Sequence, residues 1–193
     1  MSLITIIDKE TLIEQIIDAF AAVKLEDGIG LWEGQALDDH VQNTTEYKRL
    51  KDKDERNDWR RIPIADLYKC SSSISFMDAK GIRFHLGLYL LFAMDVFEDE
   101  EDRLHKHPNF KFSPPEVVFA LDSSLDAEYS IARFSLLTRE QITCVVEFLM
   151  YRLQELESCA QDSSHGMYQR SYDRQHQSLT SAITIWQEKR VAI

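Results

Sequence analysis

Residues 75–90 read SFMDAKGIRFHLGLYL, and this stretch decides the fold. A polar segment, residues 78–81, separates the apolar residues before it from the long apolar run after it. Gly81 can adopt the positive φ that a tight reversal of the chain needs, and Phe76 and Ile82 on either side can fix the reversal to a core. We therefore predict a short β-hairpin near residues 73–84 that packs against the following helix.

The run between residues 85 and 97 is apolar almost all round, which is typical of a helix buried in a globular core. The spacing of apolar residues also predicts an amphipathic, central helix over residues 9–24. Further helical patterns occupy residues 31–45, 117–121, 138–156 and 172–190. The charged residues 46–59 are interpreted as an extension of the helix before them, and residues 64–68 as a short turn of helix. The predicted fold class is mainly α: one compact domain, residues 1–193, of five to seven helices with the hairpin, and α+β as the second choice.

Two helix starts are marked by capping residues. Ser113 and Glu116 flank two prolines, an arrangement in which serine caps the helix and proline occupies the first turn. Thr138 and Gln141 form the ends of a second capping box, directly before the longest amphipathic stripe of the chain. This second start predicts the most regular helix of the protein.

Composition and charge restrict the function classes. The chain has 193 residues, of which 44% are hydrophobic, enough for the core of one domain. Its 33 Asp and Glu against 22 Lys and Arg give a formal net charge of -11, which repels phosphate backbones and anionic membranes. We therefore expect a basic protein as the partner, and neither nucleic acid nor a membrane. Negative charge also keeps proteins soluble, so charge alone does not establish a partner.

The cysteines and the N-terminus indicate the compartment. Cys70, Cys144 and Cys159 form no CxxC pair and no metal-finger spacing, so we expect reduced and mostly buried thiols. The N-terminus lacks the positive flank and long apolar run of a signal peptide, and the longest apolar stretch, residues 86–94, is too short to cross a bilayer. These features predict a soluble, cytoplasmic protein.

Asp38, Asp39 and His40 offer the carboxylates and the imidazole that a divalent metal or a general acid–base pair uses. Neighbouring residues of a helix point in different directions, so a site here needs a further residue from elsewhere, such as His85 or Asp95. The other interpretation is a polar outer face of a helix, and it is the one that we favour.

Five acidic residues precede two histidines in a segment that we expect to be a surface loop. The acidic residues are Glu98, Asp99, Glu100, Glu101 and Asp102, and the histidines are His105 and His107. Such side chains can bind zinc or nickel, but a physiological site holds its ligands on rigid elements with supporting hydrogen bonds. We therefore expect no physiological metal here.

A nucleophile and a base could come from Cys70, the serines at 71–73 and His85, because these residues flank the predicted hairpin. No GxSxG elbow and no cysteine-protease signature surrounds them, so we interpret the serines as turn residues and expect no catalytic residue. The patterns GxGxxG, GxxxxGK[ST] and HExxH are absent as well, so we expect no cofactor.

The central stretch resembles a motif of a family of uncharacterised bacterial proteins that is known only as a domain of unknown function. In that family an aromatic hairpin of the type SFLxPEGFRFYLPAYL leads into a buried helix. The matching segments here are SFMD at 75–78, GIRF at 81–84 and LGLYL at 86–90, preceded by Trp59 and Ile62. Gly87 stands where the family often has proline. The resemblance implies a compact cytoplasmic domain, and it implies no catalytic or binding residue.

These observations lead to three hypotheses for the function. The first is a non-enzymatic protein-binding module, of an immunity or regulatory type, whose acidic surface docks a basic protein. The alternative is a small hydrolase or metal-dependent enzyme, whose side chains must meet in one pocket. Its candidate residues are Asp38, Asp39, His40 and His85. The third is a homodimer that associates through an aromatic patch near Trp32 or Trp186.

Overall fold

The structure is a computed structural model that describes residues 7–107, 110, 112–122, 131–162 and 169–192. Contacts along the chain group it into two compact units. The first comprises residues 1–19, 121–127 and 137–193, and the second comprises residues 20–120 and 128–136. A single domain over residues 1–193 stays a prediction.

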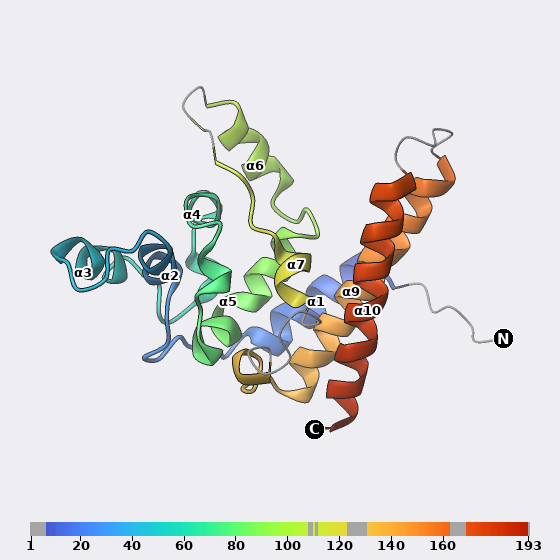
Figure 1. The fold of residues 1–193 in the computed structure, drawn as a ribbon, viewed down its shortest axis with the longest axis horizontal. Helices are drawn as coiled ribbons and strands as arrows, with labels where there is room; N and C mark the ends of the chain where they lie inside the picture. The colour runs from blue at the N-terminus through green and yellow to red at the C-terminus, as the bar shows by residue number, and fades with distance from the viewer. Residues whose placement is uncertain (1–6, 108–109, 111, 123–130, 163–168, 193) are drawn as a thin grey trace. The chain divides into compact units, whose positions relative to one another are not determined.

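Three helices make up most of the first unit. They are α1 (Lys9–Phe20), of which Phe20 belongs to the second unit, α9 (Arg139–Asp162) and α10 (Gln169–Ala192). Helices α9 and α10 lie side by side (Figure 1). The buried side chains of this unit include Leu12, Ile16, Ile142, Val145, Val146, Phe148, Leu149, Leu179, Ala182, Ile183 and Trp186. Burial of a large apolar side chain stabilises the fold by about 1.5–3 kcal/mol, so these residues hold the three helices together.

The start of α9 confirms the predicted capping box. The Gln141 amide N–H donates to Thr138 Oγ1 at 3.3 Å, and the Thr138 N–H donates to Gln141 Oε1 at 3.0 Å. The Gln141 side chain also donates from Nε2 to the carbonyl of Ala19 at 3.0 Å. One glutamine therefore both caps α9 and joins it to the C-terminal part of α1.

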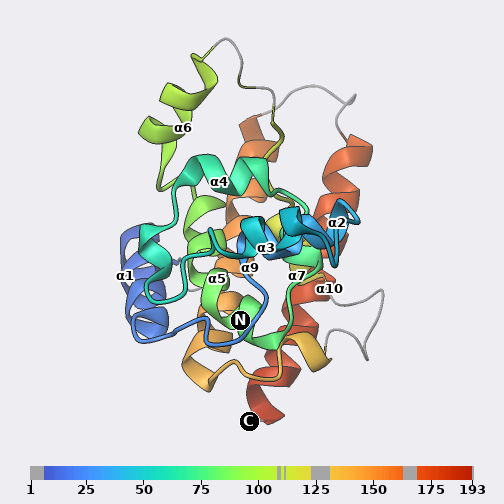
Figure 2. The same ribbon diagram turned by 90° about the vertical axis from the view of Figure 1, so that its left-hand side faces the viewer.

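The second unit consists of short helices around one long buried helix. Its α-helices are α2 (Leu31–Asp38), α3 (Thr45–Lys51), α4 (Ile64–Lys69), α5 (Ala79–Phe92), α6 (Glu98–His105) and α7 (Val117–Leu121), of which Leu121 belongs to the first unit. Two 3-10 helices, η1 (Trp59–Arg61) and η2 (Ser73–Ser75), connect them. Helices α2 and α3 are neighbours (Figure 2). Every residue of α5 is buried except Ala79, Lys80 and Arg83.

The predicted β-hairpin near residues 73–84 is wrong, because the described residues contain no strand and this segment is η2 followed by the start of α5. Asp78 is the N-cap of α5, and its Oδ1 accepts hydrogen bonds from the N–H groups of Gly81 at 2.8 Å and Ile29 at 3.0 Å. Gly81 does not have a positive φ. A Cβ there would lie 2.2 Å from the Ile29 carbonyl oxygen, so this glycine serves a close approach of two backbones and not a turn.

Burial of α5 confirms a buried helix in the apolar run, but the helix begins at Ala79 and ends at Phe92 and not at residue 97, since residues 93–97 form a turn in which Asp95 has a φ of 55°. Gly87 lies where a Cβ would be 3.0 Å from the Cβ and Cγ of Phe20, so its lack of a side chain lets Phe20 pack closely on α5. The carbonyl of Phe20 in turn accepts a 2.9 Å hydrogen bond from the indole Nε1 of buried Trp59. These contacts seat one face of α5 within the second unit.

The described ranges contain nine α-helices, more than the five to seven that we predicted. The predicted helix over residues 31–45 ends at Asp38, since His40 and Asn43 have φ values of 58° and 63°, which a helix cannot continue. Helix α3 then starts afresh, with Thr44 Oγ1 accepting from the Tyr47 N–H at 3.0 Å. The acidic segment that we expected to be a loop is helix α6.

Two further predictions concern cysteines and membranes. Cys70 and Cys144 are buried, as expected, whereas Cys159 is exposed. Within the part of the chain that the structure describes, no helix is both long enough and apolar enough to span a membrane.

Candidate functional site

The carboxylates of Asp38 and Asp39 accept hydrogen bonds from other side chains at the end of α2. Asp38 Oδ2 accepts from Ser72 Oγ at 2.7 Å, and Asp39 Oδ1 accepts from Gln35 Nε2 at 3.1 Å. The exposed His40 has its Nδ1 3.2 Å from the Leu37 carbonyl oxygen. The three residues therefore end a helix on the surface, which agrees with the polar-face interpretation.

His85 lies in a different environment, inside the second unit. It is 1% exposed, and its Nδ1 lies 2.8 Å from the Gly81 carbonyl, to which it donates. Its Nε2 is buried and has no hydrogen-bond partner among the described residues. Burial lowers the pKa of His85 to about 4, so the ring is neutral at pH 7. Asp95, the other predicted partner of a site, is exposed on the loop after α5.

The predicted enzyme constellation does not come together as a metal centre. Over the described ranges, no group of three or more His, Cys, Asp or Glu side chains is placed to hold a metal ion. His85 is enclosed, whereas Asp39 and His40 are exposed to water. A shared, solvent-filled pocket for these residues therefore has no support.

The candidate nucleophiles near residue 70 are also engaged in the structure of the second unit. Ser73 Oγ donates to the Leu31 carbonyl at 2.6 Å, and Ser72 Oγ donates to Asp38. Cys70 is fully buried, and this burial raises the pKa of its thiol, which keeps it protonated and unreactive. These groups hold helices together, as the turn interpretation of the serines expects.

Helix α6 carries the five consecutive acidic residues that the sequence singles out. Four of them, Glu98 to Glu101, lie in its first turn, where negative charge is stabilised by the positive end of the helix dipole. No residue of α6 is buried. The prediction of a loop failed because this segment has no apolar stripe, which is the usual sequence signal of a helix.

One buried tyrosine holds α6 in place. The Tyr68 hydroxyl donates to Glu101 Oε2 at 2.5 Å, and its ring lies edge-on to Phe92 in α5, with centroids 5.5 Å apart. The same ring contacts His105 at 5.5 Å and Phe110 at 5.1 Å. Burial and the contact with Glu101 raise the pKa of Tyr68, so the hydroxyl stays a donor. His105 is thus part of an aromatic cluster, and no metal group is built on it within the described residues.

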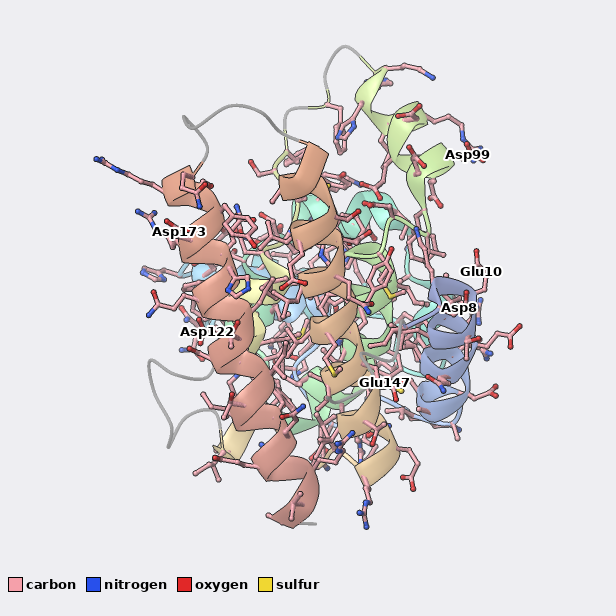
Figure 3. The ribbon with its side chains drawn as sticks, turned by 90° about the vertical axis from the view of Figure 1, so that its right-hand side faces the viewer. Asp8, Glu10, Asp99, Asp122, Glu147 and Asp173 are labelled. Atoms are coloured by element: carbon pink, nitrogen blue, oxygen red, sulfur yellow. The ribbon has the colours of Figure 1, made fainter. Side chains whose placement is uncertain are left out.

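Besides Glu101, α6 exposes four further carboxylates. We call Glu98, Asp99, Glu100 and Asp102 the acidic face. All four are exposed, and the first three form no ion pair with any described side chain. Asp102 has one weak ion pair, 3.8 Å to Lys106, between two exposed side chains. Figure 3 shows Asp99 pointing out from α6 into solvent. A held helix that presents unpaired carboxylates can bind cationic groups of another molecule.

A second acidic cluster, which sequence reasoning missed, is buried between α2 and α3. Glu33 is 3% exposed, and its Oε1 accepts from the Tyr47 hydroxyl at 2.5 Å and from Lys51 Nζ at 2.6 Å. Asp54 caps α2 by accepting from the N–H groups of Trp32 at 2.7 Å and Glu33 at 3.2 Å. Burial raises the pKa of Asp54 to about 6. In the sequence, the cluster is marked by Gly30. A Cβ at this position would lie 2.1 Å from Asp54 Cγ, so a larger residue would displace the Asp54 carboxylate.

Comparison with known proteins places the chain in a family. The model of a family of unknown function, DUF6714, matches residues 8–189. The chain belongs to this family. Membership in DUF6714 confirms the resemblance to a domain of unknown function, whereas the bacterial origin and the family motif stay predictions. Comparisons with curated proteins and with solved structures find no match. DUF6714 therefore supplies no activity, and the function has to be argued from the surface of this chain.

Proposed function

We propose that this member of DUF6714 is a non-enzymatic, cytoplasmic binding module, of an immunity or regulatory type, whose acidic face on α6 docks a basic segment of a partner protein. The observation that carries the proposal is the combination of exposed, unpaired carboxylates with a helix fixed by Tyr68. The net charge of -11 acts in the same direction, because it attracts cationic proteins at long range.

Fixing α6 before binding favours affinity. A segment that must become ordered on binding loses conformational entropy, and that cost lowers the affinity. Here the hydrogen bond from Tyr68 to Glu101 and the edge-on contact of the Tyr68 ring with His105 hold the helix. The acidic face is left for the partner, where complementary charge raises the association rate and excludes acidic competitors.

The enzyme alternative has less support. Its base, His85, is neutral and enclosed, and its carboxylates at Asp38 and Asp39 accept hydrogen bonds from other side chains at the end of α2. An enzyme needs these groups at a solvent-accessible pocket with substrate. The homodimer hypothesis loses one of its two anchors, because Trp186 is 1% exposed and Trp32 is half-buried.

A capture experiment with matched charge variants tests the proposal. The tagged wild-type chain, the double variant Asp99→Lys/Glu100→Lys and the control Glu14→Lys/Glu188→Lys are each incubated with extract of the source cells. Both variants change the net charge by the same amount, and the control residues are exposed on α1 and α10. Bound proteins are then identified by mass spectrometry.

We expect a basic protein that the wild type and the control retain and that the α6 variant loses. Loss of the same protein from both variants would mean that only the overall charge matters and that α6 is no docking site. Retention by all three chains would contradict the proposal as well.

A further inference from the structure

A pocket of about 560 Å³ opens between α1 and α9 in the first unit, and it shares no residue with the acidic face. Its volume falls in the range of small-molecule sites, about 300–1,000 Å³. The residues that line it are Gln15, Asp18, Ala19, Arg139, Glu140, Thr143 and Cys144. The members from each helix are spaced as one helix face, so both helices present a continuous stripe to the pocket.

The pocket is formed by a fixed pair of helix ends. The hydrogen bond from Gln141 Nε2 to the Ala19 carbonyl joins α9 to α1 beside the pocket, and Gln141 is only 2% exposed. Its side chain and that of Thr138 also cap α9. A ligand therefore meets walls that are already placed, which lowers the entropy cost of binding.

The chemistry of the lining combines an apolar floor with charges of both signs at the rim. Cys144 is 4% exposed, and Ala19 and Thr143 are half-buried. Burial raises the pKa of the Cys144 thiol to about 12, so it behaves as a small apolar group. At the rim, Arg139 carries a positive charge and Asp18 and Glu140 carry negative ones, and none of the three forms a close ion pair with a described side chain. Hydrogen bonds to its own N–H and to Thr138, together with the charge of Arg139, hold the pKa of Glu140 below its usual range, so this carboxylate is ionised.

This charge pattern discriminates between ligand classes. The two carboxylates would repel a purely anionic ligand, and the Arg139 guanidinium would repel a purely cationic one. A neutral apolar ligand would displace water from all three charged side chains and offer them no hydrogen bond in return, which is unfavourable. A small zwitterion satisfies both signs at once, because guanidinium binds a carboxylate in a bidentate manner and carboxylates bind ammonium.

We propose that this pocket binds a free α-amino acid with an apolar side chain. The ligand carboxylate pairs with Arg139, its ammonium group lies between Asp18 and Glu140, and its side chain lies on the floor at Ala19 and Cys144. This site would give the module a small-molecule input that is separate from docking on α6. The pocket and the acidic face on α6 can therefore be tested separately, and failure of one proposal does not decide the other.

Titration of the isotope-labelled full chain with L-leucine tests the site, followed by amide NMR signals. We expect saturable shifts at Ala19, Thr143 and Cys144 below about 20 mM ligand. Leucinamide lacks the carboxylate and N-acetyl-leucine lacks the ammonium, so each should bind at least about tenfold more weakly. Absence of saturable shifts with L-leucine, or equal binding of the three compounds, would overturn the proposal.

Variants assign the charges to their roles. Arg139→Gln should weaken L-leucine at least about tenfold and should not weaken leucinamide, because the repulsion of its ammonium group by the guanidinium is removed, whereas Asp18→Asn should weaken leucinamide. Arg170→Gln, at an exposed position of α10, is the matched control and should bind like the wild type. Thr143→Leu narrows the pocket without changing its charge and should weaken L-leucine binding at least about tenfold. Unchanged L-leucine binding in both Arg139→Gln and Thr143→Leu would place the ligand elsewhere.

Discussion

Tyr68 donates a 2.5 Å hydrogen bond to Glu101, and this contact joins a buried side chain of α4 to a helix that buries none of its own residues. The carboxylate that accepts the bond lies within the acidic run, so the same segment supplies both its anchor and its exposed charge. The position of α6 therefore depends on one phenol and the aromatic rings around it, and this dependence can be tested.

Removal of the Tyr68 hydroxyl should loosen α6 without unfolding the second unit. Hydrogen bonds to a charged acceptor contribute about 1.5–3 kcal/mol, and Glu101 regains water when the bond is lost, so we expect Tyr68→Phe to cost about 1–2 kcal/mol. Amide hydrogen exchange over residues 98–105 should become faster. Tyr172→Phe on α10 is the control and should change neither quantity. Unchanged exchange in α6 would mean that another contact holds it.

Two glycines of α5 should differ in their sensitivity to an added methyl group. At Gly81 the new Cβ would lie 2.2 Å from the backbone oxygen of Ile29, which cannot move without breaking the cap at Asp78. At Gly87 it would lie 3.0 Å from the side chain of Phe20, which can shift. We expect Gly81→Ala to cost about 3–5 kcal/mol and Gly87→Ala about 1–2 kcal/mol in urea unfolding. The reverse order would contradict the packing described for this helix.

Asp54 and His85 should make opposite contributions to stability between pH 4 and 6. The pKa of Asp54 is raised from 3.8 to about 6, so its contribution is full at low pH and is lost as the pH rises through this range. The pKa of His85 is lowered from 6.5 to about 4, so its contribution is lost as the pH falls. Each shift corresponds to about 3 kcal/mol, and the two largely cancel.

Single variants separate these two contributions. We measure the free energy of unfolding at pH 4 and pH 6.5, and take the difference between variant and wild type so that the titrations common to both chains cancel. Asp54→Asn should gain about 3 kcal/mol relative to the wild type on going from pH 4 to pH 6.5, and His85→Asn should lose a similar amount. Parallel pH profiles for all three chains would contradict both the raised pKa of Asp54 and the lowered pKa of His85.

Lys51 should stabilise the protein more than its neighbours on α3 do. Its Nζ lies 2.6 Å from the buried carboxylate of Glu33, and without it that carboxylate keeps, among the described side chains, only the Tyr47 hydroxyl as a partner. Lys51→Met should cost about 1–3 kcal/mol, because removing one partner leaves a buried charge uncompensated. Lys48→Met, an exposed change with the same loss of charge, should stay within about 0.5 kcal/mol. Equal effects of the two variants would contradict the proposed role of Lys51.

The sequence predicted correctly those features that depend on residues close together in the chain. The capping box of Thr138 and Gln141 and the all-round apolar character of α5 were both legible in the sequence. The prediction of a hairpin at Asp78 and Gly81 was wrong, since an aspartate with a glycine three residues later suits a turn as well as a helix start. Only the approach of Ile29, far away in the chain, decides between the two.

The candidate surface depended even more on distant contacts. An acidic run without apolar residues gives no helical signal, and α6 is positioned by Tyr68, which lies 33 residues before Glu101. The charge of the segment was predictable, but its rigidity was not. The buried pair of Glu33 and Asp54 was missed for a similar reason, because carboxylates in a polar pattern are ordinarily placed in solvent.

The central claim is that the acidic face of α6 binds a basic partner, and the salt dependence of affinity tests it most directly. With the captured partner in hand, the dissociation constant is measured by calorimetry at about 50 and 200 mM salt for the wild type and for Asp99→Lys/Glu100→Lys. We predict wild-type binding that weakens at least about tenfold with salt, and a variant that binds more weakly with little salt dependence. Equal affinities and equal salt dependence for the two chains would contradict the account.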